Sequence, residues 1–217
     1  MLRLIIETSN LDFQLALHTS GQNGSQGGFA YRSDKDAAGT PSELTEMLTA
    51  GLAQADRSIA EIDEIVVDLG PGGLTSTRSG IAFANGLAFA RNIKIVGANS
   101  LELMVLQIAR DPNDHVIAAR RSNDGNYFLG FFQGGICHKL ALGKPMELIH
   151  GLGWQNEEPT WVGPHPKNWV DEPPALNVEF IDLLSPGLEA FDNLMATPEF
   201  AGRPRLDAAG PMNETIR

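Results

Sequence analysis

The sequence predicts an α/β fold with mixed β-sheets, and three observations support this prediction. Short runs rich in β-branched residues, such as Ile65–Val67, have the length and composition of buried strands. Segments with helical periodicity separate the later runs, and strands that alternate with helices run parallel in one sheet. With 217 residues, 42% of them hydrophobic and 20% charged, the chain can form one large domain or two small ones.

Three strands are expected near the N-terminus. Leu2–Ile6 is a short apolar run closed by the polar turn Glu7–Asn10. Phe13–His18 alternates apolar and polar residues, and Phe29 and Tyr31 mark a third strand. Because short turns separate these runs, we expect an antiparallel meander.

A helix start follows at Thr40–Glu43. Thr40 is the expected N-cap, Pro41 takes the first helical position, and Glu43 completes a capping box. One face of this helix, over residues 41–55, holds Leu44, Met47, Leu48, Gly51, Leu52 and Ala55. Ser58–Glu61 offers a second capping box on a short helix that leads into the strand at Ile65.

The chain then turns through Gly70-Pro71-Gly72-Gly73, where glycines allow a backbone or a ligand to approach closely. Thr75 is the expected N-cap of a helix that ends near Arg91. Between Gly80 and Ala90 this helix has apolar or small residues on all sides, with Asn85 as the one polar residue. Two interpretations stay open: a helix enclosed by its own domain, or one with a face on its own sheet and a face on a partner.

The remaining chain is expected to repeat strands and helices less regularly. Apolar patterns predict elements at 93–96 (strand), 100–108 (helix), 115–119, 127–132, 136–142 and 178–184 (strands), and 186–195 (helix). Residues 147–174 show no clear period, and the tail after Thr197 is expected to be irregular. We therefore expect an N-terminal β-β-β-α-β-α subdomain at 1–98 and a degenerate C-terminal subdomain at 99–217.

Composition argues against several classes of protein. The net charge of −11 opposes direct binding of nucleic acid, which needs clustered Lys and Arg to neutralise phosphates. Cys137 is the single cysteine, so no intramolecular disulfide forms, and a reducing compartment is expected. No apolar run has the ~20 residues of a membrane helix, and the N-terminus carries no signal-peptide cleavage pattern. These features predict a cytoplasmic protein without a membrane association.

The sequence also shows none of the usual motifs for phosphate binding, dinucleotide binding, metal binding or a catalytic thiol. The glycine turn does not end in Gly-Lys-Ser/Thr and does not match the dinucleotide pattern. The five histidines show no i, i+4 pairing and no cysteine cluster, so we expect no metal site. Cys137 and His138 are neighbours in an expected strand, so their side chains point to opposite faces, which argues against a catalytic thiol. We expect no catalytic residue, no metal and no cofactor.

Three segments in order resemble one family. They are ETS after the first apolar run, GPGGLTSTRSGIAFANGLAFA in the centre, and VGANSLE after the following strand. They resemble the TsaB (YeaZ) family over roughly residues 1–105. The resemblance implies an actin/Hsp70-like (ribonuclease H-like) fold with mixed sheets and two subdomains, the second one shortened.

The resemblance also implies a role. TsaB-like proteins are non-catalytic: they hold and activate the paralogue TsaD, which forms threonylcarbamoyladenosine in tRNA, together with the ATPase TsaE. We therefore expect a TsaD-type paralogue and a TsaE-type ATPase as partners, a homodimer in isolation, and tRNA contact only through the complex. In the family, two helices of each N-terminal subdomain pair as a four-helix bundle. The expected interface comprises Leu44, Met47, Leu48, Gly51, Arg78, Ala82, Phe83, Gly86, Leu87, Phe89 and Ala90.

Two rival functions stay open. One is a nucleotide-dependent kinase or transferase of the same fold, with a candidate phosphate loop of Glu7, Thr8, Gly70, Gly72, Gly73 and Thr75. Glu7 takes the place of the family's usual Asp, which weakens the case for a nucleotide site. The other, more remote rival is a glycoprotease-like metallopeptidase, which the missing ligand cluster opposes.

Overall fold

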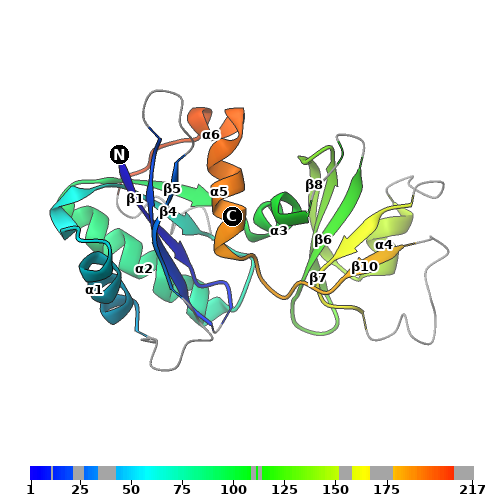
Figure 1. Ribbon diagram of the computed structural model, residues 1–217. Helices are drawn as coiled ribbons and strands as arrows, with labels where there is room; N and C mark the ends of the chain where they lie inside the picture. The colour runs from blue at the N-terminus through cyan, green and yellow to red at the C-terminus, as the bar shows by residue number, and fades with distance from the viewer. Residues whose placement is uncertain are drawn as a thin grey trace. The chain divides into compact units, whose positions relative to one another are not determined.

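The structure is a computed structural model that describes residues 1–10, 12–21, 27–33, 43–108, 111, 114–151, 158–166 and 178–207. The chain divides into two compact units (Figure 1). The first unit comprises Met1–Ser100 together with Gly187–Arg217, and the second unit comprises Leu101–Pro186. This division differs from the expected ranges 1–98 and 99–217, because the segment from Gly187 onward returns to the first unit.

The first unit is built on a five-stranded mixed sheet. Its order is β3-β2-β1-β4-β5. The strands are β1 (Leu2–Glu7), β2 (Gln14–Thr19), β3 (Gly28–Arg32), β4 (Ile62–Asp68) and β5 (Lys94–Ala98). The pairs β1/β2 and β2/β3 are antiparallel, and β1/β4 and β4/β5 are parallel. The expected meander followed by parallel strands is therefore confirmed.

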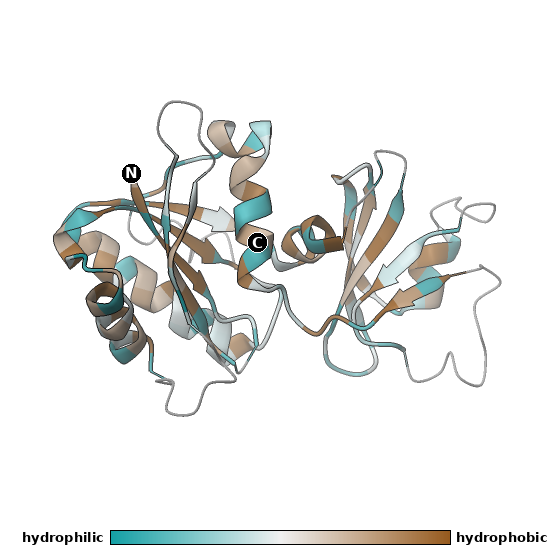
Figure 2. Ribbon diagram, in the orientation of Figure 1, coloured by the Kyte–Doolittle hydropathy of each residue, from teal (hydrophilic) through white to brown (hydrophobic). Residues whose placement is uncertain are grey.

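Helices cover both faces of this sheet. Helices α1 (Leu44–Gln54) and α2 (Leu74–Arg91) pack on one face, where Leu4 and Ile6 of β1 belong to their common core. Successive strand residues point to opposite faces. Helix α5 (Leu188–Ala196) contacts β1 and β2 and buries Leu188, Phe191 and Leu194. Hydrophobic residues run along the strands between these layers (Figure 2).

The helix starts differ in part from the expected ones. Helix α1 has Glu43 as its N-cap, and the expected cap Thr40 lies outside the described residues. The prediction of Thr75 as the N-cap of α2 is wrong, because Gly73 takes that position and the glycine turn leads directly into the helix. The capping box at Ser58 is confirmed: the Ser58 N–H donates to Glu61 at 2.7 Å, at the short 3-10 helix η1 (Ile59–Glu61).

The second unit repeats the strand topology of the first. Its sheet has the order β10-β9-β6-β7-β8. The strands are β6 (His115–Arg121), β7 (Tyr127–Gln133), β8 (Ile136–Gly143), β9 (Thr160–Val162) and β10 (Glu179–Ile181). As in the first unit, three antiparallel strands are followed by two parallel ones. The two units are thus structural repeats in the order and direction of their strands.

The faces of the second sheet have separate cores. Helix α3 (Ser100–Ile108) packs Leu101 and Met104 against Val116 and Phe132 on one face. Helix α4 (Pro145–His150) packs Ile149 with the opposite face, which includes Trp161. Residues 147–174 show no clear period in the sequence because the elements described there are short: α4 has six residues and β9 has three.

The tail after Thr197 is not irregular in its described part, contrary to expectation. Helix α6 (Pro198–Gly202) follows α5 directly. Leu206 then forms two backbone hydrogen bonds with Ile95 of β5, at 3.0 and 2.8 Å. Arg205 donates to Glu64, which also accepts from Arg3 at 2.8 Å. The sequence analysis missed the structure of this C-terminal segment because the segment is held by contacts with β4 and β5, which local periodicity does not reveal.

Candidate functional site: a groove between α1 and α2

Helix α2 is buried on one side only. Ile81, Ala84 and Ala88 face the core of the first unit, with Ile81 fully buried. Ala82, Gly86 and Ala90 are exposed on the other side, and Phe89 is 84% exposed. The interpretation of a helix enclosed by its own domain is therefore wrong. The described contacts fit the alternative, a helix with one face on its own sheet and an apolar outer face.

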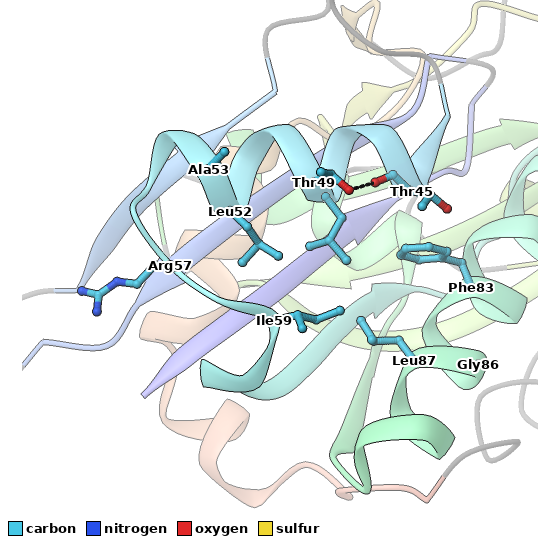
Figure 3. A pocket seen from close by; sticks show the side chains of 10 residues that line it. Thr45, Thr49, Leu52, Ala53, Arg57, Ile59, Phe83, Gly86 and Leu87 are labelled. Carbon is cyan, nitrogen blue, oxygen red and sulfur yellow. Dashed lines mark hydrogen bonds between the residues drawn. The ribbon is translucent and has the colours of Figure 1, made fainter.

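A groove of about 690 Å³ lies between α1 and α2 (Figure 3). We call it the α1–α2 groove. Its lining residues are Thr45, Leu48, Thr49, Leu52, Ala53, Arg57, Ile59, Phe83, Gly86 and Leu87. The side chains of Leu52, Ile59, Phe83 and Leu87 converge on the space between the helices. An apolar groove bounded by two helices can receive the apolar face of a further helix.

The contribution of α1 differs from the expected one. Leu44 and Met47 are buried against the sheet, and Leu48 is buried at the floor of the groove. Gly51 faces the ring of Tyr31 on β3 and not the outside. Leu44, Met47 and Gly51 were assigned to the interface because the helix pattern shows one apolar face, and that face packs on the sheet. Of the exposed residues of α1, Thr45, Thr49 and Ala53 line the groove, and sequence patterns did not single them out.

Charged groups lie beside the groove. Arg57 lines it and forms an ion pair with Glu61 at 3.1 Å. The Ser58 backbone N–H and the Arg57 guanidinium hold the pKa of Glu61 below its ordinary value. Arg78 is exposed near the start of α2, and Leu74, at the first helical position, is 65% exposed. The groove therefore combines apolar walls with one ion-paired cation, and Ile59 is an apolar lining residue that the sequence analysis missed.

The glycine turn is packed against the end of β1. A Cβ added to Gly72 would lie 2.3 Å from the carbonyl oxygen of Ser9, and the Gly73 N–H donates to that oxygen at 2.8 Å. A Cβ added to Gly80 would lie 2.0 Å from Oγ1 of Thr8. These glycines allow α2 and its turn to sit directly on the chain after β1. Gly72 closely approaches the backbone of Ser9, and Gly80 closely approaches the side chain of Thr8.

The carboxylates at the two neighbouring strand ends are fully buried. Glu7 accepts from the N–H and the hydroxyl of Ser9, and Gln14 lies 3.3 Å from its second oxygen. Asp68 accepts from the Gly70 N–H at 2.8 Å and from the hydroxyl of Ser100. The structure places Glu7, Thr8, Gly70, Gly72 and Gly73, the residues of the candidate phosphate loop, at and after the ends of the neighbouring strands β1 and β4. Thr75 is exposed at the first turn of α2.

Other reactive residues lie apart from this region. Among the described residues, no group of three or more His, Cys, Asp or Glu is arranged to hold a metal ion. His18 is buried and lies 3.0 Å from Asp192 of α5. Cys137 is on β8, and partial burial raises the pKa of its thiol. No helix in the described part of the chain is both long and apolar enough to span a bilayer.

Known proteins resemble the chain in sequence over short segments. Residues 41–123 match the family model of TsaD, tRNA N6-adenosine threonylcarbamoyltransferase. The enzyme of that name from Desulfovibrio desulfuricans is 42% identical over 55 residues, which are 25% of this chain and 15% of that protein. An uncharacterised protein of Mycobacterium tuberculosis is 37% identical over 67 residues, 31% of this chain and 32% of that one. The chain thus spans less than a third of the length of these relatives.

Two solved structures resemble the chain over nearly its whole length. One is an uncharacterised Pseudomonas aeruginosa protein with similarity to peptidase YeaZ, with a TM-score of 0.71, 20% identity and 96% of each chain covered. The other is YeaZ from Pseudomonas aeruginosa, with a TM-score of 0.69, 20% identity and 97% of each chain covered. The chain has two five-stranded mixed sheets, as expected, and shares its fold with these two structures. The sequence match over residues 41–123 and the likeness in fold are what the chain shares with TsaD and YeaZ proteins.

Proposed function

We propose that this chain is a non-catalytic scaffold that binds and activates a TsaD-type enzyme in the formation of threonylcarbamoyladenosine in tRNA. The observation that carries the proposal is the apolar outer face of α2 together with the apolar α1–α2 groove beside it. The TsaD match over residues 41–123 and the YeaZ-like fold support the choice of pathway.

The interface proposed for the partner is the α1–α2 groove with the outer face of α2. Phe83 and Leu87 form its wall, and Phe89 projects beside it, 84% exposed. Burying a side chain such as Phe89 stabilises a complex by about 1.5–3 kcal/mol. Ala82, Gly86 and Ala90 recur every four residues on the same face, so a partner helix can approach α2 closely. Helix α2 therefore supplies most of the proposed contact.

The same surface accounts for the proposed assemblies. A TsaD-type paralogue would place two helices on α1 and α2 as a four-helix bundle, and a second copy of this chain would do so in isolation. Because both occupants use one surface, the homodimer and the complex exclude each other. A TsaE-type ATPase and tRNA would join through the complex, since a chain with net charge −11 gains little from phosphate contacts of its own.

The proposed lack of catalysis is supported by how the glycine turn is used. The Gly73 N–H bonds Ser9 and the carboxylate of Glu7 accepts from its own neighbours, so both serve contacts within the chain. A phosphate cradle needs such amide groups directed at the ligand. The described contacts therefore favour the scaffold over a nucleotide-dependent kinase or transferase.

Depletion of the chain in its own cells tests the proposal. Mass spectrometry of tRNA nucleosides should show a loss of threonylcarbamoyladenosine, restored by the wild-type chain. A Gly86→Arg variant should fail to restore it, because the new side chain occupies the interface. A Gly202→Arg variant is the matched control, since Gly202 also lies in a helix with open space at its Cβ. Unchanged modification after depletion would contradict the proposed function.

A further inference from the structure

Strand β8 is the edge of the second unit's sheet. In the part of the chain that the structure describes, β7 is the one strand it pairs with. An edge strand presents backbone N–H and C=O groups that a further strand can bond. In the first unit, Leu206 bonds the edge strand β5. The outer edge of β8 is a place where a strand can be added.

Apolar side chains on β8 lie beside α3. Leu140 is opposite Gly130 and Leu142 is opposite Phe128, and directly opposite residues share a face. Phe128 packs with the core under α3, and a Cβ added to Gly130 would lie 3.4 Å from Cβ of Leu101. Helix α3 therefore covers β7 and leaves Leu140 and Leu142 of β8 exposed. Leu140 and Leu142 are each 57% exposed, so a contiguous apolar strip borders the edge.

The other face of β8 carries a lysine. Lys139 is opposite Phe131, on the α4 side of the sheet. The segment Ile136–Lys144 contains two lysines and one histidine and no acidic residue, although the chain carries 27 acidic against 16 basic residues. Neither Lys139 nor Lys144 has an ion pair within the described residues. Like charges on neighbouring strands repel, so Lys139 disfavours pairing of β8 with a second copy of itself.

We propose that β8 binds an extended segment of another protein by strand addition, and that this segment alternates apolar and acidic residues. Its apolar residues pack on Leu140 and Leu142 on the α3 side. Its carboxylates face Lys139 on the α4 side. The added strand bonds the free edge of β8, so backbone groups give affinity and the alternation gives specificity. This surface is in the second unit and is separate from the α1–α2 groove.

Binding is tested with a fluorescent nine-residue peptide of alternating valine and glutamate, measured by anisotropy with the full chain. The peptide should bind, and one of alternating valine and lysine should not. Lys139→Glu should weaken binding by about tenfold, because an attraction becomes a repulsion. The control Arg78→Glu makes the same charge change at an exposed site of the first unit and should have no effect. Gly86→Arg should also leave binding unchanged, which separates this test from that of the groove.

A second readout uses Cys137, the chain's single cysteine, which lies on β8 itself. Saturating peptide should slow its alkylation by iodoacetamide. The double variant Leu140→Thr, Leu142→Thr keeps residues suited to a strand and should bind more weakly. The proposal is overturned by no binding at about 1 mM peptide, by equal binding to Lys139→Glu, or by unchanged alkylation. Self-association of the wild-type chain that the double variant abolishes would assign the edge to a second copy and also overturn it.

Discussion

Gly51 of α1 lies against the ring of Tyr31 on β3, so closely that an added Cβ would be 2.5 Å from Cδ1 of the ring. This contact holds α1 on its own sheet. Gly51→Ala should therefore destabilise the first unit by about 1–3 kcal/mol, as overpacking in a core does. Urea unfolding measures the change. Association with a partner should persist in the folded variant, and a variant as stable as the wild type would show that Tyr31 moves aside without cost.

His18 predicts a dependence of stability on pH. Burial lowers its pKa below 6.5, and the hydrogen bond to Asp192 opposes this shift only in part. Between the folded-state pKa and 6.5 the unfolded chain binds more protons than the folded one, so stability falls as the pH decreases through this window. The stabilisation that comes from neutral His18 is fully present above pH 6.5. Below that pH the free energy of unfolding falls by at most about 1.4 kcal/mol per pH unit.

Urea unfolding between pH 7.5 and pH 5 tests this for the wild type and His18→Gln. The variant should lose less stability on acidification. His138→Gln, at an exposed position of β8, is the control and should behave as the wild type. Equal pH dependence in His18→Gln and the wild type would show that other groups cause the effect.

Arg205 attaches the C-terminal segment to β4 of the first unit. Its guanidinium bonds Glu64 at 3.0 Å, bonds backbone carbonyls of α6, and lies over the ring of Phe200. Arg205→Met should lower the free energy of unfolding by about 1–3 kcal/mol, since a buried carboxylate loses a charged partner. Arg57→Met breaks an exposed pair with Glu61 and should cost less than about 1 kcal/mol. If both variants lost the same free energy of unfolding in urea, the contacts of Arg205 with Glu64 would stabilise the chain no more than the exposed pair does.

The glycine turn predicts negligible nucleotide affinity. Because the Gly73 N–H already bonds Ser9, binding of a phosphate there would require this contact to break. Isothermal titration with Mg-ATP should give no saturable heat, which corresponds to a dissociation constant above about 1 mM. A micromolar dissociation constant would restore the kinase or transferase interpretation.

The sequence predicted the fold well where the pattern is local. The strands at Leu2–Ile6 and Ile65–Val67 and the helix Ser100–Ile108 were found because strand length and helical period show directly in a short window. Helix α6 and the Leu206 bridge were missed because they depend on β4 and β5, far away in the chain.

The site was predicted only in part, for a similar reason. Ala82, Gly86 and Phe89 were placed correctly on an outer face of α2, since a helix with apolar residues all round exceeds what one sheet covers. Leu44 and Met47 were wrongly assigned to the interface, because an apolar helix face has the same sequence pattern whether it packs on a sheet or on a partner. Whether a partner occupies the face stays a prediction.

Association of the Gly86→Arg variant tests the central claim most directly. Gly86 has open space at its Cβ and lines the α1–α2 groove, so the fold should tolerate arginine while the interface should not. The variant, the Gly202→Arg control and the wild type are each co-purified with the TsaD-type paralogue from the same cells, with light scattering for mass and circular dichroism for folding. The account predicts a folded Gly86→Arg chain that neither binds the paralogue nor self-associates, beside a control that does both. A Gly86→Arg chain that binds as the wild type does, or one that unfolds, would contradict it.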